Sequence, residues 1–418
     1  MNSMELKSKN AIFTICAKNY LAQAKTLGFS LRKFAPEIDF YIILSDEIGT
    51  DTIDYAGFEI IEAKTLHNIP FFYELAFKYD VIEFSTAVKP FFLDLLINEK
   101  GYTKVLYIDP DMVVYSSLDF LFEALDKQDA LLTPHLLYPY IKYEGATREE
   151  ELLFVGIYNL GFFGINNSVN GKHIIEWWKV KLKDQCFADK EDGLHVDQKW
   201  MDFLPALFGE KVLILRHPGI NLAFWNMHER VFVDNGKEYT VDGAPLVIFH
   251  FSGLDPLNYQ EIARKQTKFN LTNLPQYTRL FKEYVTELKS NQFNYLSTLI
   301  YRYNKFDNQV HILKYQRRLY RSLLNEGYQF ANPFQTGANT LYALLDSNKL
   351  IIQDKQGKYM ALKKGITDFN AKVSKMQFLL LCCKKLIGIK YYYLLMRFME
   401  VYARFEKQSF LIKKGNQL

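Results

Sequence analysis

Two aspartates separated by a proline, Asp109 and Asp111, directly follow the apolar run Lys104–Ile108. Alternate side chains of an extended segment point in opposite directions, but a turn through Pro110 would let both carboxylates approach one cation. Mg²⁺ and Mn²⁺ accept such oxygen ligands and share them with substrate phosphates, so the pair predicts a metal-bound diphosphate. The cation would stabilise the departing nucleotide. The alternative is a turn in which an aspartate caps a helix near Leu118–Leu125.

A histidine, His250, ends a second apolar run, Val247–Phe249. A single histidine in this position is more often a hydrogen-bonded core residue than a ligand. Together with the two aspartates it becomes a candidate third ligand. An imidazole nitrogen fits Mn²⁺ better than a site built only for oxygen ligands.

Several short stretches, in this order, resemble glycosyltransferase family 8, the retaining enzymes of the GT-A fold, and related bacterial polysaccharide glycosyltransferases. The stretches are Thr14–Tyr20, Lys89, Lys104–Val114, Asn159–Phe163, Asp197-Gln198 and His250–Gly253. The resemblance covers about residues 10–270, and its specificity comes from order and spacing. The sequence departs from the family at Leu160, in place of a small polar residue, and at Leu254-Asp255-Pro256, in place of a run that contains lysine.

The resemblance implies a role for each matching residue. Asp109, Asp111 and His250 would bind Mn²⁺ or Mg²⁺, and Asp197 and Gln198 would be catalytic residues at the donor sugar. The implied contacts to a nucleotide-sugar donor, UDP-linked by the same resemblance, are Thr14, Ala17, Asn19, Tyr20, Lys89, Asp109, Asn159, Gly161 and Gly253. Lys265 or Lys268 is our candidate to replace the phosphate contact that the family pattern has and this sequence lacks.

Some of these residues have a second interpretation from the sequence alone. Asp197 would otherwise be a surface charge or an acid at a helix N-terminus. Trp225, Asn226 and His228 are candidates for an acceptor cleft. The resemblance also implies that the reaction retains the configuration of the sugar.

These residues need an α/β scaffold to position them. Apolar runs that predict strands alternate with segments of helical spacing, which indicates a mostly parallel sheet of Rossmann-like type, as in the GT-A fold that the resemblance implies. The predicted strands are 11–16, 40–44, 58–61, 104–108, 160–165 and 245–249. The predicted helical segments are 19–34, 70–96 with a new start at Pro90, 169–183 and 196–208. Ligands of such sheets bind at the carboxyl ends of the strands, where the two aspartates fall.

Charge divides the chain into two predicted domains, 1–290 for glycosyl transfer and 291–418, which is basic and mainly helical. The second domain carries 21 Lys and Arg against 7 Asp and Glu. Its mixture of apolar, aromatic and basic residues fits peripheral contact with an anionic membrane, or an ordinary helical subdomain. Because the first domain is acidic, nucleic acid is not an expected partner.

The four cysteines, Cys16, Cys186, Cys382 and Cys383, have no metal-ligand spacing and no paired framework. This pattern is typical of a reducing compartment, so we expect a cytoplasmic protein, with possible peripheral contact at the inner face of the membrane.

The leading hypothesis is a hexosyltransferase-type enzyme of polysaccharide biosynthesis that extends a glycan or a lipid-linked acceptor. A protein-glycosylating transferase and a sugar-1-phosphate nucleotidyltransferase are the alternatives, although Ala17–Gln23 lacks the Gly-rich basic loop of the latter class. A glycan-binding module without activity would not require the two aspartates.

Overall fold

The computed structural model describes residues 9–356 and 369–412. The chain forms two compact units, Met1–Pro70 with Val81–Tyr301, and Phe71–Asp80 with Arg302–Leu418. The functional division into 1–290 and 291–418 stays a prediction.

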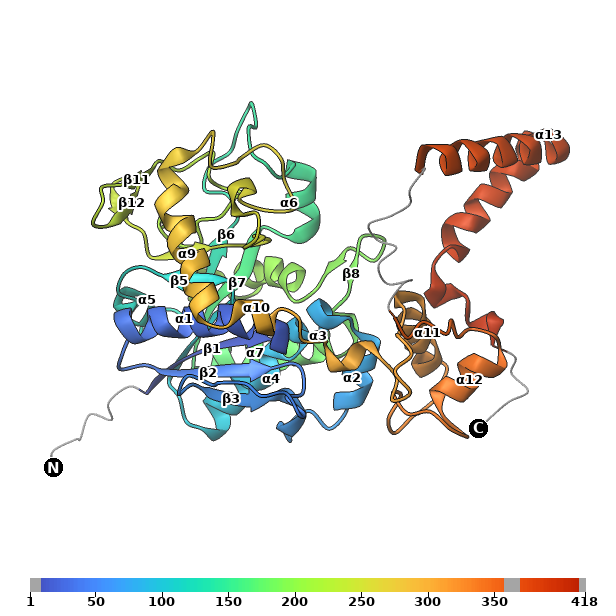
Figure 1. Ribbon diagram of the computed structural model, residues 1–418, viewed down its shortest axis with the longest axis horizontal. Coiled ribbons are helices and arrows are strands. Elements are labelled where there is room, and N and C mark those ends of the chain that lie inside the picture. The colour runs from blue at the N-terminus through green and yellow to red at the C-terminus, as the bar shows by residue number, and fades with distance from the viewer. Residues whose placement is uncertain (1–8, 357–368, 413–418) are drawn as a thin grey trace. The chain divides into compact units, whose positions relative to one another are not determined.

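A seven-stranded sheet forms the centre of the first unit, in the order β10-β6-β7-β4-β1-β2-β3 (Figure 1). Its strands are β1 (Asn10–Cys16), β2 (Asp39–Leu44), β3 (Glu59–Glu62), β4 (Lys104–Ile108), β6 (Ala130–Pro134), β7 (Tyr158–Asn166) and β10 (Val212–Ile214). Only β7 runs antiparallel to its neighbours in this sheet. The predicted α/β class with a mostly parallel sheet is confirmed.

Helices cover both faces of the sheet. On one face, Leu27 and Leu31 of α1 (Leu21–Phe34) pack in one core cluster with Ile12 of β1. On the other face, Phe13 meets Phe92 of α4 (Lys89–Asp94), with ring centroids 5.2 Å apart. Successive residues of β1 therefore serve opposite layers, as the period of a strand requires.

α7 (Val169–Gln185) packs against β7 through Trp178, whose ring lies 5.2 Å from that of Phe163. Its N-cap is Ser168, whose hydroxyl accepts a hydrogen bond from Gly171 N at 2.9 Å. Ser168 thus satisfies one of the free N–H groups of the first turn.

One helix prediction needs correction and another gains detail. The mostly helical stretch 70–96 consists of three helices, α2 (Phe72–Lys78), α3 (Val81–Ala87) and α4, followed by a π-helical turn at Leu95–Glu99. α4 begins at Lys89, beside the predicted new start at Pro90. The predicted helix 196–208 is a 3₁₀ segment, Gln198–Phe203, followed by α8 (Leu204–Phe208). The other short elements of this unit are α5 (Asp119–Ala124), α6 (Glu149–Val155), α10 (Phe293–Leu296), β8 (Ala188–Asp189), β9 (Leu194–His195), β11 (Phe232–Asp234), β12 (Tyr239–Val241) and β13 (Ala244–Pro245).

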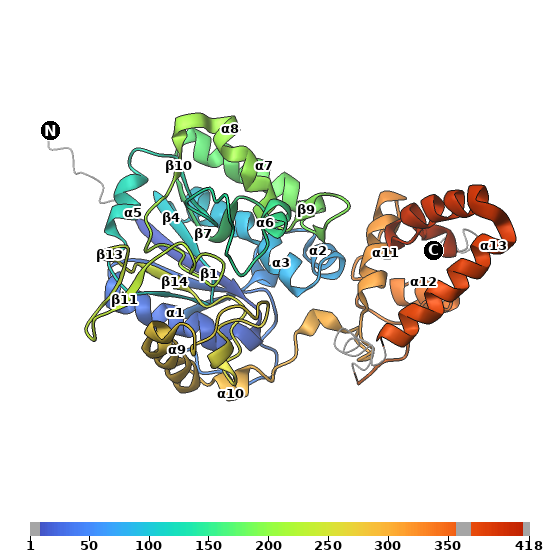
Figure 2. The same ribbon diagram turned by 90° about the horizontal axis from the view of Figure 1, so that it is seen from above.

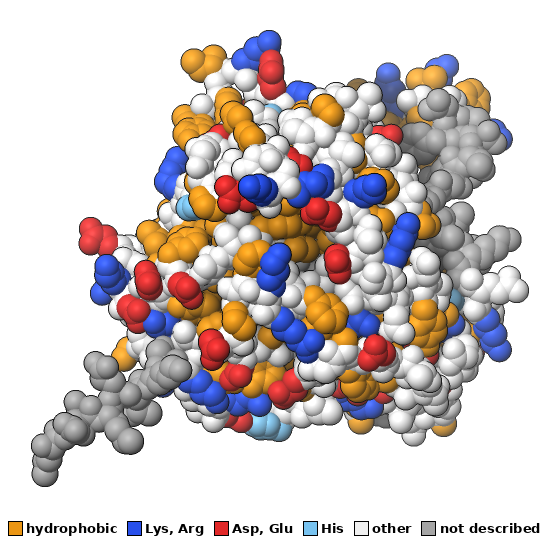
Figure 3. Space-filling model, turned by 60° about the vertical axis from the view of Figure 1, so that its left-hand side comes forward, with side chains coloured by type: hydrophobic (Ala, Val, Ile, Leu, Met, Phe, Trp, Pro, Cys, Tyr) orange, Lys and Arg blue, Asp and Glu red, His pale blue; other side chains and the backbone are white. Residues whose placement is uncertain are grey.

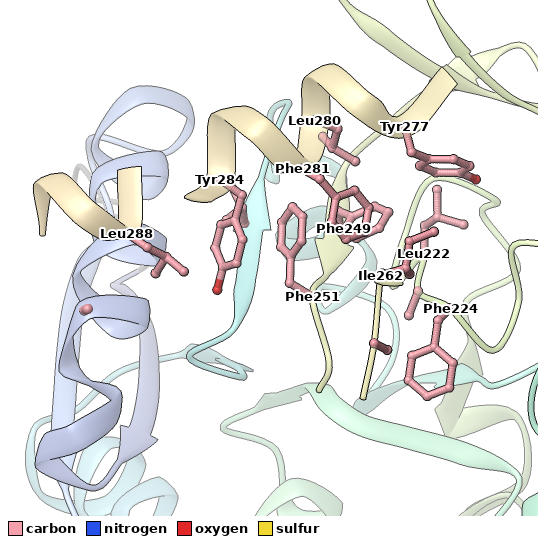
Figure 4. Packing of buried hydrophobic residues seen from close by; sticks show 14 of the residues in the cluster. Leu222, Phe224, Phe249, Phe251, Ile262, Tyr277, Leu280, Phe281, Tyr284 and Leu288 are labelled. Carbon is pink, nitrogen blue, oxygen red and sulfur yellow. The ribbon is translucent and has the colours of Figure 1, made fainter. Parts of the chain in front are cut away.

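A separate two-stranded sheet pairs β5 (Met112–Val114) with β14 (Ile248–His250), antiparallel. Aromatic side chains hold β14 against α9 (Thr278–Ser290), as Figure 4 shows. The rings of Phe251 and Tyr284 stack 3.7 Å apart, and Phe249 meets Phe281 edge-on at 5.5 Å. Because Phe249 and Phe251 both face α9, the residue between them, His250, points the other way.

The second unit is mainly helical in its described part, as predicted. It contains α2, α11 (Lys314–Asn325), α12 (Leu341–Ser347) and α13 (Phe369–Tyr402) (Figure 2). The buried guanidinium of Arg317 donates hydrogen bonds to the carbonyl oxygens of Ala76, Phe77, Tyr79 and Tyr303.

α13 bends at Gly388, whose φ is 73°. Large apolar side chains are exposed along both of its arms, for example Phe378 at 65% and Leu386 at 85%. Among the described residues, no helix has the length and apolar character that crossing a bilayer requires.

Candidate metal centre

The turn between β4 and β5 carries Asp109 and Asp111, and the pairing of β5 with β14 places His250 opposite Met112. His250 Nε2 lies 3.1 Å from Asp111 Oδ1 and 3.8 Å from Asp109 Oδ2. One ligand atom from each residue lies within 4.8 Å of the others. The helix-cap interpretation of the aspartates is wrong, because α5 begins at Asp119 with Leu118 as its N-cap.

Gly161 of β7 gives this cluster its space. A Cβ atom at position 161 would lie 2.8 Å from Asp109 Oδ2 and 2.8 Å from His250 Cε1. The backbone also contributes, since Asp109 N donates to Gly161 O at 2.7 Å. Gly161, which the sequence predicted at the donor site, thus has no side chain where Asp109 and His250 lie.

The three candidate ligands shift one another's pKa values. Burial would favour neutral His250, but the nearby Asp111 and Asp109 outweigh burial and raise the pKa of His250. His250 in turn lowers the pKa of Asp111 against the effect of burial. Burial raises the pKa of Asp109 despite Lys89 and His250. Two carboxylates around one imidazole nitrogen favour a positive charge between them.

A buried ion pair lies behind Asp109. Lys89 Nζ is 2.5 Å from Asp197 Oδ2 and 2.9 Å from Leu160 O, and the ion-paired side chains are 1% and 3% exposed. The same ammonium lies 3.8 Å from the centre of the Tyr107 ring, and Tyr107 OH donates to Asp109 Oδ1. Lys89, predicted at the donor, and Asp197, predicted at the sugar, are thus brought together, and the interpretation of Asp197 as a surface charge is wrong.

Gln198 and Asn159 lie side by side at the start of β7. Gln198 Oε1 accepts from Leu160 N at 3.0 Å, and Gln198 Nε2 donates to Val155 O at 2.8 Å. Asn159 Oδ1 accepts from Gly161 N at 3.1 Å. A backbone N–H can only donate and a backbone C=O can only accept, so these contacts fix which atom of each amide is the oxygen and which is the nitrogen.

Tyr20 and Gly253 line a small pocket together with Asp111 and Gln23. Burial, and after it the charge of Asp111, raise the pKa of Tyr20 to about 12. Lys265 follows in the loop after Gly253, and its charge contributes to lowering the pKa of Asp111. Tyr20 and Gly253 thus lie beside Asp111, and Lys265 is close enough for its charge to affect Asp111.

Thr14, Ala17 and Asn19 lie at or after the carboxyl end of β1, which runs parallel to β4. The topology therefore places them at the edge of the sheet that carries Asp109. Thr14 Oγ1 is buried and has no hydrogen-bond partner within the described part of the chain. The donor-binding roles of these three residues stay predictions.

Sequence reasoning gave no role to Tyr107 or Asn221, although both contact candidate ligands. Asn221 Oδ1 lies 3.2 Å from His250 Nδ1. The signal was a cluster of amides, Asn221 and Asn226, in the otherwise apolar run 220–227. Asn226, named for the acceptor cleft, is fully buried and bonds backbone groups at Ala223, His135 and Asn221.

Trp225, also named for the acceptor cleft, is only 5% exposed, and its ring packs edge-on against His250 at 5.1 Å.

Two carboxylates and one imidazole are a donor set that suits Mn²⁺. The missing side chain of Gly161 leaves room for Asp109 and His250 to lie close together. The residues present therefore fit a divalent cation.

Comparison with family models finds no match. The chain is 28% identical over 284 residues to the uncharacterized protein YfnF of Bacillus subtilis strain 168, covering 66% of this chain and 91% of that protein. It is 22% identical over 255 residues to the uncharacterized protein YfnD of the same strain, covering 59% and 79%.

Solved structures similar to this chain include glycosyltransferases. One is GlyE of Streptococcus pneumoniae TIGR4, with a TM-score of 0.40 and 18% identity over 73% of this chain and 67% of that one. Another is the galactosyltransferase LgtC in complex with donor and acceptor sugar analogs, with a TM-score of 0.39 and 17% identity over 66% and 95%. The α/β class of the chain rests on its own sheet order.

Proposed function

We propose that this chain is a metal-dependent glycosyltransferase that moves a sugar from a nucleoside-diphosphate donor, UDP-linked by resemblance, to a glycan or lipid-linked acceptor. The observation that supports it most is the Asp109–Asp111–His250 cluster at the carboxyl end of β4. A central strand that ends in two partly exposed carboxylates beside a pocket is where α/β proteins bind phosphorylated ligands.

The chain's own residues supply binding and charge. Asp109, Asp111 and His250 would hold Mn²⁺ or Mg²⁺, which when bound supplies Lewis-acid stabilisation of the diphosphate leaving group. Lys265 brings a positive charge to the same edge and would contact the diphosphate. Tyr20 and Gly253, which line the pocket with Asp111, would border the donor.

Asp197 and Gln198 are proposed to orient the donor sugar, with Asn159 and Gly161 beneath it. Val196, the residue before Asp197, has a φ of 44°, which is unusual for a β-branched side chain. Such strain persists where the surroundings hold it, and it concentrates at functional sites. Retention of configuration is part of the proposal and comes from the family resemblance.

The acceptor side of the proposal includes contact with a membrane. α13 contains six Lys and Arg and one Glu among its apolar residues. Exposed aromatic side chains such as Tyr391, Tyr393 and Phe398 suit the interfacial region of a bilayer, and the basic residues suit anionic lipid. A peripheral enzyme in this position would meet a lipid-linked acceptor.

Sedimentation with phosphatidylglycerol vesicles tests this contact. We expect wild-type protein to bind, and Lys384→Glu/Lys385→Glu to bind at least tenfold more weakly. Lys282→Glu/Lys289→Glu, which makes the same charge change on exposed positions of α9, is the matched control. Equal binding by the two double variants, or no binding by the wild type, contradicts the membrane contact.

Nucleic acid is not part of the proposal. Figure 3 shows Lys and Arg interspersed with Asp and Glu over one face of the molecule. A nucleic-acid-binding face would instead gather basic side chains in one stripe or patch.

Hydrolysis of a panel of nucleotide sugars tests the proposed function. We expect Mn²⁺-dependent release of the nucleotide from at least one UDP-sugar, lost on addition of EDTA and restored by Mn²⁺. Turnover that is unchanged in EDTA would contradict the metal dependence. Formation of a nucleoside triphosphate and a sugar 1-phosphate from the nucleotide sugar and added pyrophosphate would instead identify a nucleotidyltransferase.

A further inference from the structure

Asn221 connects the candidate metal centre to the backbone of the central sheet. Its side chain is buried, and its amide has three partners in the described structure. Asn221 Nδ2 donates to Thr133 Oγ1 at 2.9 Å and to Asn159 Oδ1 at 3.0 Å, and Asn221 Oδ1 lies 3.2 Å from His250 Nδ1.

The direction of each hydrogen bond follows from one backbone group. Gly161 N–H can only donate, so the atom of Asn159 that faces it is the oxygen Oδ1. An oxygen at that point needs a donor from Asn221, which assigns Nδ2 to that side of the Asn221 amide. The other end of the amide is therefore Oδ1, which can only accept.

His250 must then donate from Nδ1. Since Asn221 Oδ1 is an acceptor, the Nδ1 atom of His250 carries a hydrogen, and in the neutral ring Nε2 keeps its lone pair. Nε2 faces Asp111 Oδ1 and Asp109 Oδ2. A divalent cation bound between them would take the place of the Nε2 proton, and the three residues would then offer one electron-pair donor each to the same point.

The far side of Asn159 gives the same orientation independently. Leu160 N–H donates to Gln198 Oε1, so that oxygen is an acceptor, and Asn159 turns Nδ2 toward it at 3.5 Å. Asn159 Nδ2 also lies 3.3 Å from His135 Nε2. Two separate backbone N–H groups of β7, at residues 160 and 161, thus fix the same amide.

We propose that Asn221 is a positioning residue that fixes the tautomer and the ring orientation of His250 as a metal ligand. The backbone of β7 fixes the orientation of Asn159, and Asn159 in turn fixes the orientation of the Asn221 amide. This inference rests on the proposed function, because it assigns His250 to a divalent cation. Partners of this kind commonly raise metal affinity by making one nitrogen available and holding the ring still.

The loop that carries Asn221 has supports besides the Asn221 side chain. Asn226 Nδ2 donates to Asn221 O at 3.1 Å, and Arg230 Nη1 donates to Ile220 O at 2.9 Å. His250 N donates to Leu222 O at 2.8 Å. Asn221 itself has a φ of 55°, a left-handed conformation that asparagine adopts more readily than alanine, so the free energy of unfolding of Asn221→Ala is measured beside its Mn²⁺ affinity.

Mn²⁺ affinity of the full chain, measured from the electron paramagnetic resonance signal of free Mn²⁺, tests the inference without reference to turnover. We expect Asn221→Ala to bind Mn²⁺ about 10–100-fold more weakly than the wild type. Asn166→Ala is the matched control, because Asn166 also makes three side-chain hydrogen bonds, to Leu125 O, Gln128 O and Ser168 N, at the opposite end of β7. It should bind Mn²⁺ as the wild type does.

A second variant tests the path through Asn159. Asn159→Ala removes the oxygen that accepts from Asn221 Nδ2 and should weaken Mn²⁺ binding about as much as Asn221→Ala does, whereas the Asn166→Ala control should not. Wild-type affinity in Asn221→Ala overturns the positioning role and leaves the proposed function standing. Absence of Mn²⁺ binding by the wild type contradicts the proposed function itself.

Discussion

Asp109 occupies the space that a side chain at Gly161 would need. Its Oδ2 atom lies 2.8 Å from the position of a Cβ at residue 161, while its backbone N–H donates to Gly161 O at 2.7 Å. β7 thus accepts a hydrogen bond from the backbone of Asp109, and the missing side chain of Gly161 leaves space for the Asp109 carboxylate. Real Cβ atoms do not approach other atoms this closely, so a larger residue must displace the Asp109 carboxylate and the His250 ring, as well as Met112 Cε at 2.6 Å.

Gly161→Ala is therefore expected to lower Mn²⁺ affinity at least tenfold, measured by titration of the purified protein. Gly164→Ala is the control on the same strand, since its added Cβ would meet only side-chain atoms of Leu106 and Leu131, away from the metal cluster. If both variants bind Mn²⁺ as the wild type does, the steric argument at Gly161 is wrong.

The Lys89–Asp197 pair predicts a large effect on stability when one partner is removed. Lys89→Met leaves Asp197 buried without its cation, and we expect the free energy of unfolding to fall by about 3–5 kcal/mol, measured by urea denaturation. Lys64→Met, which removes the partner of Glu47 at a more exposed ion pair, should cost about 1 kcal/mol or less.

The double variant Lys89→Met/Asp197→Leu separates stability from activity. Replacing both charges with apolar groups should recover most of the lost stability, because no uncompensated charge remains. If Asp197 orients the donor sugar as proposed, sugar transfer should stay lost in the double variant. Recovery of stability together with activity would show that the pair is only structural.

His135 predicts a loss of stability in mild acid. Burial lowers the pKa of His135 to about 4, and its two ring nitrogens face Ile157 O and Asn159 Nδ2, which suits the neutral ring. The unfolded state takes up a proton near pH 6.5, so the contribution is full above that pH and is lost as pH falls toward 4.

Between pH 7 and pH 5 the loss from this group is about 2 kcal/mol. Urea denaturation of wild-type protein and His135→Gln at both pH values measures it. The variant should be less stable at pH 7 and should lose less stability on acidification. Equal pH dependence of the two proteins would contradict the buried neutral state of His135.

The sequence allowed the fold class to be predicted because local signals were strong. The runs 11–16, 40–44 and 104–108 are apolar except for Thr14 and Lys104, as strands buried on both faces require, and each is confirmed within two residues. The run 196–208 was wrongly predicted as one helix, because it starts with a strained backbone at Val196 and contains Pro205 in the first turn of α8.

The metal cluster was predicted from residue type, but its support was not. Asp109 and Asp111 are two positions apart in the chain, and the structure brings them to His250 as expected. The contact of Asn221 with His250 spans 29 residues and that of Lys89 with Asp197 spans 108. Such long-range partners leave no periodic signal in one sequence, because the sheet order and not the local pattern brings them together.

Anomalous diffraction from crystals grown with Mn²⁺ and UDP tests whether Asp109, Asp111 and His250 bind a metal together with a diphosphate. We expect one strong manganese peak within bonding distance of Asp109, Asp111 and His250 Nε2, with diphosphate oxygens completing its coordination. A peak elsewhere, or UDP bound away from the two aspartates, would contradict it.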